Sequence, residues 1–218
     1  MKAADIQRLA GRGEGPTLEF KLRTPEAMRL AKEVIAFANT NGGRVLIGVD
    51  DDGSVVGVKD AIEEEFSFRQ ALESHCSPPV RWRMERVEIT RKRDVIVLAI
   101  PRSRHRPHFV IVADGSEVAV AYVRVGDRSL EASPAAVDLM LSDTNPKDVQ
   151  FEFGDTEIRL MKYLEEYGRV TIEFFSRFAG LDEIKARSIL VDLTKAGVLS
   201  HHLDFNHEYF TMSYVGEN

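Results

Sequence analysis

Hydrophobic and polar positions follow one pattern up to about residue 145 and a different one after it. In the first part, alternating or continuous apolar runs take turns with segments whose apolar residues recur every three to four positions. The apolar runs predict strands over 18–22, 44–49, 54–58, 80–89, 94–100, 109–112 and 118–125. The helical spacing predicts a short lead-in helix within 1–12 and helices over 24–38, 61–76 and 133–142. This mixture predicts an α+β domain, built on β-hairpins, over residues 1–145.

The second part of the chain has a mainly helical pattern. A polar stretch, 143–148, carries Pro146 and is the predicted linker. Helical spacing then predicts helices over 155–167, 171–179 and 183–196, followed by short strands over 199–203 and 208–213. Three helices and a two-stranded hairpin are the elements of a winged helix-turn-helix domain. The sequence therefore predicts such a domain over residues 150–218.

Composition narrows the class of protein. With 218 residues, 44% of them hydrophobic, the chain has enough apolar residues for a core, which argues against general disorder. No apolar stretch approaches about 18 residues and no signal peptide is visible, so we expect no membrane span and a cytoplasmic protein. The single cysteine, Cys76, suits a reducing compartment. Scattered histidines without a C-x-x-C pair argue against zinc.

Charge is distributed unevenly along the chain. The total is -6, from 29 Lys and Arg against 35 Asp and Glu, which argues against coating nucleic acid through bulk charge. Residues 151–218 hold 7 basic and 12 acidic side chains, whereas 1–150 hold 22 and 23. Within the first domain, 81–107 hold nine basic and three acidic side chains, a local charge of +6. This stretch is either a solvated face or a surface that grips a phosphate backbone.

The candidate nucleic-acid contacts of the first domain come mainly from this basic stretch. On a strand, Arg81 and Arg83 share one face, and Trp82 and Met84 point to the core on the other. The candidates are Lys21, Arg81, Arg83, Arg91, Lys92, Arg93, Arg104 and Arg106.

Several short motifs occur in a characteristic order in the first domain. They are Leu18-Glu19-Phe20-Lys21, then IAFANTNGG over 35–43, VLIGVDD over 45–51, VVG over 55–57, a loop over 103–108 with Pro107, and YVRVG over 122–126. Together they resemble the AlbA-like, Schlafen-type DNA-binding domain over about residues 13–140. This domain is common in bacterial and archaeal regulators, where it often precedes a C-terminal winged helix, as the predicted elements do here. The resemblance therefore implies a prokaryotic nucleic-acid-binding regulator. No G-x-x-x-x-G-K-[ST] loop is present, so a P-loop ATPase has no support.

The resemblance also raises the possibility of catalysis. Nuclease members of the Schlafen family carry two glutamates five residues apart and a later aspartate, and the matching positions are Glu14, Glu19 and Asp51. Converging carboxylates could hold Mg²⁺ or Mn²⁺ for phosphodiester cleavage. The structural alternative is that Glu14 is a loop residue, Glu19 pairs with Lys21 or an arginine, and the aspartates shape a turn. For a binding protein we expect no cofactor.

The C-terminal module admits two roles. Its third helix could read DNA in the major groove, with Lys185, Arg187 and Ser188 as contacts. Its net charge of -5, from 7 basic and 12 acidic residues, opposes DNA binding and suits a unit for dimerisation or protein docking.

The leading hypothesis is therefore a non-catalytic, homodimeric DNA-binding transcriptional regulator. The alternatives are a metal-dependent nuclease and a protein-docking adaptor.

Overall fold

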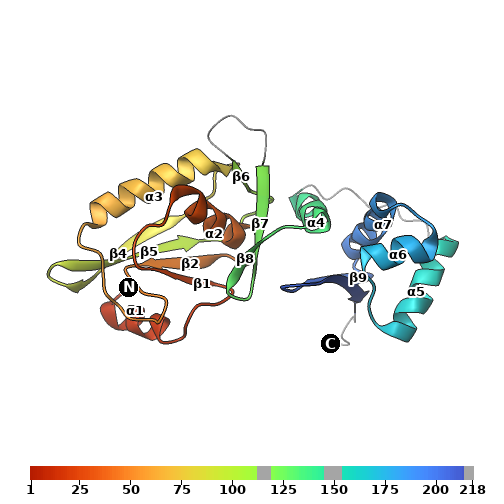
Figure 1. Cartoon of the computed structure of the whole chain (residues 1–218), viewed down its shortest axis with the longest axis horizontal. Coiled ribbons are helices and arrows are strands. Elements are labelled where there is room, and N and C mark those ends of the chain that lie inside the picture. The colour runs from red at the N-terminus through yellow and green to blue at the C-terminus, as the bar shows by residue number, and fades with distance from the viewer. Residues whose placement is uncertain (112–118, 145–153, 214–218) are drawn as a thin grey trace. The chain divides into compact units, whose positions relative to one another are not determined.

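The computed structural model describes residues 1–111, 119–144 and 154–213 (Figure 1). The chain forms two compact units, Met1–Ala132 and Ser133–Asn218. Both contain helices and strands, and the predicted α+β class is confirmed. None of the described helices combines the length and the apolar character needed to cross a membrane.

The described residues of the first unit form two four-stranded sheets and three helices. The helices are α1 (Ala3–Ala10), α2 (Ala27–Asn39) and α3 (Ala61–His75). The first sheet has the order β1-β2-β5-β4, from β1 (Leu18–Lys21), β2 (Gly43–Ile47), β5 (Arg93–Ile100) and β4 (Arg83–Thr90). Only β1 and β2 are parallel in this sheet. The second sheet has the antiparallel order β3-β6-β7-β8, from β3 (Cys76–Ser77), β6 (Phe109–Ile111), β7 (Ala119–Val125) and β8 (Arg128–Glu131).

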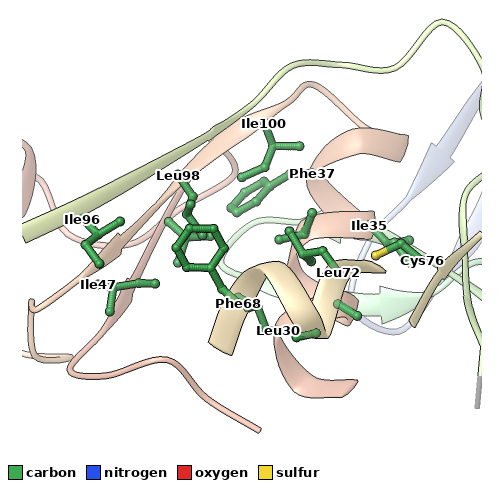
Figure 2. Close-up of a cluster of buried hydrophobic side chains, with 14 of the residues drawn as sticks. Leu30, Ile35, Phe37, Ile47, Phe68, Leu72, Cys76, Ile96, Leu98 and Ile100 are labelled. Carbon is green, nitrogen blue, oxygen red and sulfur yellow. The ribbon is translucent and has the colours of Figure 1, made fainter. Parts of the chain in front are cut away.

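The first sheet is covered on both faces. Side chains of α2, α3 and β5, including Phe37, Phe68 and Leu98, form one buried cluster (Figure 2). On the opposite face, Ile6 of α1 packs with Phe20 and Val97. Because each strand side chain faces one of these two layers, the central strands read as nearly continuous apolar runs.

The junction between α2 and β2 requires glycine. Gly42 has a φ of +73°, and a Cβ there would lie 2.7 Å from both Arg102 N and Ile100 O. Its N–H donates to Phe37 O at 2.8 Å, which closes the end of the helix. The chain thus passes directly from a buried helix into a buried strand.

Some predicted elements of the first unit differ from the structure. Residues 54–58 form only isolated bridges, Val49 with Val55 and Val58 with Asp94, instead of a full return strand. The short strands β3 and β8 lacked an alternating pattern long enough to be predicted. The turn expected at Asp114-Gly115 and most of the expected linker, residues 145–148, lie outside the described residues.

Within residues 133–144 and 154–213, the second unit has four helices and one hairpin. These are α4 (Pro134–Thr144), α5 (Asp155–Tyr167), α6 (Ile172–Ala179), α7 (Glu183–Lys195), β9 (Leu199–Leu203) and β10 (Glu208–Met212). Strands β9 and β10 are antiparallel, and Val170 forms a bridge to Phe210. The side chains of Thr171 and Asp182 cap α6 and α7 by accepting from Phe174 N and Lys185 N.

Helix α4 is part of the second unit. Ala135 of α4 lies in the core of the second unit. Asp138 of α4 forms an ion pair with Arg187 of α7, with 3.0 Å between Oδ2 and Nε. The two units therefore divide between Ala132 and Ser133, whereas the sequence pattern had grouped this helix with the first domain.

Candidate nucleic-acid interface

The carboxylate of Glu19, on β1, lies in a buried ion-pair network. One oxygen pairs with Lys21 Nζ, and the other accepts from Arg124 Nη2 at 2.6 Å. Lys21 Nζ also donates to Phe20 O at 2.7 Å. Glu19 is only 5% exposed. Lys21 and Arg124 balance its negative charge, so its burial leaves no unpaired charge in the core.

Arg124 connects three segments of the first unit. Its guanidinium donates to Glu33 Oε2 of α2 at 2.9 Å and to the carbonyl of Gly15 at 3.1 and 3.2 Å, and lies 4.9 Å from the centre of the Phe37 ring. The Arg124 side chain is 1% exposed. Arg124 is not among the site residues predicted from the sequence, although a lone arginine among the apolar residues of a strand indicates a buried partner of opposite charge.

The three carboxylates expected for a nuclease lie near one another. Burial raises the pKa of Glu14, and the negative charges of Glu19 and Asp51 raise it further. The hydrogen bond that Phe20 N–H donates to Glu14 Oε1 at 2.7 Å acts in the opposite direction and lowers this pKa. Asp51 lies exposed in a turn, where its N–H donates to Asp50 Oδ1. These contacts are ones that the structural alternative predicts for Glu14 and Asp51.

This arrangement does not fit a divalent metal. Both oxygens of Glu19 are already held by cationic side chains. Among the described residues, no three His, Cys, Asp or Glu side chains are placed to hold a metal ion. The donor set thus contains a carboxylate, Glu19, that is already held in a buried ion pair with two cationic side chains.

Strands β4 and β5 form a two-stranded ribbon that extends beyond the sheet. Strand β2 pairs only with residues 96–100 of β5, so the β4–β5 turn lies past the end of β2. Figure 1 shows this turn projecting at the left of the first unit. Arg91 and Lys92, both exposed, form the turn.

A second basic group lies at the other end of the ribbon. Arg81 and Arg83 are exposed, whereas Trp82 and Met84 pack against the core. Arg83 lies opposite Ala99, near the end of β5, and the chain continues from there to the exposed Arg104. The basic residues thus occupy both ends of β4.

Hydrogen bonds hold the loop that carries Arg104. His108 is 2% exposed, and its Nδ1 and Nε2 each lie 2.7 Å from a partner, Pro78 O and Ser103 Oγ. Burial lowers the pKa of His108, so its imidazole is neutral at pH 7, with Nδ1–H donating to Pro78 O and Nε2 accepting from Ser103. Asn39 holds the same loop, since its amide bonds the backbone of His108 at 2.8 and 2.9 Å.

Four of the predicted basic contacts are engaged within the chain. Arg93 Nη1 donates to Gly57 O at 2.7 Å, and Arg106 Nη1 donates to Asn39 O at 3.1 Å. Lys21 pairs with Glu19, and Arg187 pairs with Asp138. The exposed members of the predicted set are Arg81, Arg83, Arg91, Lys92, Arg104, Lys185 and Ser188.

The only cysteine is not a candidate nucleophile. Cys76 is 5% exposed, and burial raises its thiol pKa to about 12. The thiolate, which is the reactive form, is therefore scarce at neutral pH.

The family match covers about half of the chain, whereas the matches to solved structures cover 61% and 96% of it. Residues 14–133 match the family described as Schlafen, AlbA_2. The N-terminal domain of a protein from Nitrosomonas europaea, described as related to the ATP-dependent DNA helicase RecG, is similar at 24% identity. That match has a TM-score of 0.43 and covers 61% of this chain and 94% of that domain. The DIP2311 protein of Corynebacterium diphtheriae is similar at 18% identity, with a TM-score of 0.47, over 96% of this chain and 37% of that one. No curated protein matches the sequence.

Proposed function

Because the chain belongs to the Schlafen AlbA_2 family through residues 14–133, we propose that it is a nucleic-acid-binding protein whose β4–β5 ribbon contacts the phosphate backbone. Membership of this family indicates a nucleic-acid-related function. The choice of surface rests on the exposed basic residues of the ribbon.

The projecting ribbon is the observation that carries the proposal. Arg91 and Lys92 lie exposed at its turn and Arg83 at its base, with no salt-bridge partner among the residues that the structure describes. A two-stranded ribbon is narrow enough to enter the major groove of DNA. Exposed cations on such an element gain affinity by releasing counterions from phosphates.

The finer assignment is a homodimeric, non-catalytic transcriptional regulator of DNA, with the second unit acting as a winged helix. In support, α5, α6 and α7 precede a β9–β10 hairpin. Lys185 and Ser188 are exposed on α7, but Arg187 is bound to Asp138, and the module is acidic. We therefore assign the main nucleic-acid surface to the first unit and a dimerisation or docking role to the second. A metal-dependent nuclease has less support, because Glu19 is held by cations.

Salt-dependent binding tests this proposal. The fluorescence anisotropy of labelled duplex DNA, duplex RNA and single-stranded RNA is measured from about 50 to 200 mM salt. We expect Arg91→Ala with Lys92→Ala to lower the slope of log affinity against log salt by roughly 2, since each phosphate contact contributes about 0.9.

The matched control removes two charges elsewhere in the first unit. Arg29 and Lys59 are exposed and lie outside the ribbon, so Arg29→Ala with Lys59→Ala should leave the slope nearly unchanged. Equal effects of the two double variants, or no binding at low salt, would refute the assignment. The strongest binder among the three nucleic acids decides between DNA and RNA.

A further inference from the structure

Helices α5 and α6 carry a continuous row of stacked side chains, which we call the aromatic ridge: Arg159, Tyr163, Tyr167, Phe174 and Phe178. The Tyr163 ring stacks on Tyr167 at 4.6 Å and on Phe174 at 4.7 Å between centroids. Phe178 extends the row, and the Arg159 guanidinium lies 4.8 Å from its ring centre. The i, i+4 spacing of Arg159, Tyr163 and Tyr167 aligns them along one side of α5.

Two rings of the ridge are exposed, whereas Tyr163 and Phe178 are half-buried against the core of the second unit. Tyr167 is 60% exposed and Phe174 is 41% exposed. Single exposed apolar residues are ordinary, but contiguous ones from two helices mark an interaction surface. Tyrosine and phenylalanine are also enriched in protein interfaces.

The charges around the ridge favour a second copy of this chain as the partner. Among residues 155–179, four exposed acidic and four exposed basic side chains balance: Asp155, Glu165, Glu166 and Glu173 against Arg159, Lys162, Arg169 and Arg177. A neutral surface provides no attraction for nucleic acid or for a strongly charged peptide. A neutral surface also does not repel the same surface on a second copy of the chain.

The two ends of the α5 stripe carry opposite charges. Arg159 lies at the N-terminal end, and Glu166 lies near the other, where its carboxylate raises the pKa of the neighbouring Tyr167. A two-fold axis turns one helix end for end relative to its copy. Arg159 of each protomer would then meet the Glu166 end of the other, with Tyr163 midway.

We propose that the aromatic ridge is the interface of a homodimer in which α5 packs antiparallel on α5 of a second copy. The proposal deepens the homodimer part of the proposed function. Nucleic-acid contact by the first unit is measured separately, by the salt titration, so the two can fail independently.

The test is the dimer dissociation constant of the full chain, from sedimentation equilibrium over a concentration series. We expect the unaltered chain to dimerise and Tyr167→Ser to weaken the dimer by about tenfold or more. Phe66→Ser is the matched control, because Phe66 is 67% exposed on α3 in the other unit. It should leave the dimer unchanged.

A charge exchange tests the antiparallel geometry. Arg159→Glu and Glu166→Arg should each weaken the dimer, because each places like charges opposite one another. The double variant should restore the dimer, and thermal unfolding shows that each variant remains folded. A monomeric unaltered chain, a dimer unaffected by Tyr167→Ser, equal loss with Phe66→Ser, or no restoration in the double variant would each overturn the proposal.

Discussion

Arg124 holds the first unit together, and its replacement by methionine should be among the most damaging single changes there. Methionine retains much of the length and apolar contact of the side chain but no charge. The change leaves the carboxylates of Glu19 and Glu33, whose side chains alone are 7% and 13% exposed, without the guanidinium that pairs with both. It also removes the donors to the Gly15 carbonyl.

The expected loss follows from the burial of the partners. Removing one member of a buried ion pair costs about 3–5 kcal/mol, because the remaining charge stays in a poorly solvated site. Lys21 still pairs with Glu19, which places the expected loss near the lower end of this range. In a unit of this size the loss corresponds to a fall in melting temperature of about 10 °C.

The sole tryptophan reports on this unit alone. Trp82 is half-buried and packs edge-on against Phe68 at 5.3 Å, against the core of the first unit. Denaturant titration followed by its fluorescence therefore measures the free energy of unfolding of that unit. The matched control is Arg86→Met, because Arg86 forms a half-exposed pair with Asp94 at 3.6 Å in the same unit. Such a pair contributes at most about 1 kcal/mol.

Two outcomes would contradict the reasoning. One is a loss of stability with Arg124→Met no larger than with Arg86→Met. The other concerns Glu19→Gln added to Arg124→Met, which removes the unpaired charge and should recover part of the loss. If the double variant is no more stable than Arg124→Met alone, the buried carboxylate is not the cause.

Two further predictions concern backbone space and acid stability. Gly42→Ala should cost about 2–4 kcal/mol in the same fluorescence assay, from a positive φ and a clash with backbone atoms. Gly13→Ala, with a φ of +77° and no atom within 4 Å, should cost about 1 kcal/mol, and equal losses would exclude the clash. Although burial acts in the opposite direction, hydrogen bonds from His201 and Ser133 lower the pKa of Glu208 below its ordinary 4.5. A lowered carboxyl pKa stabilises the fold above pH 4.5, and this contribution is lost as the pH falls through the folded-state pKa. The protection of the amides of residues 199–212 against hydrogen exchange, relative to the intrinsic exchange rate at each pH, should therefore fall more steeply below pH 4.5 in the unaltered chain than in Glu208→Gln; parallel profiles would disprove this.

Elements with strong local signals were predictable from the sequence. Helix α2 follows from apolar residues at helical spacing and from the glycines at its end, and β5 from a continuous apolar run. The partners of single side chains were not predictable in this way. Arg93 binds Gly57 O, whereas Arg91 is exposed, and nothing in the local sequence pattern distinguishes these two arginines.

The sequence by itself determined the α+β class, the family motifs and the position of the basic stretch, because periodicity and local charge are properties of neighbouring residues. Only the tertiary structure decided that Glu19 is matched by Arg124, more than a hundred residues away, and that α4 packs with α7. These contacts depend on how separate elements pack and on the desolvation of paired charges. Both are set by the three-dimensional arrangement of segments distant along the chain.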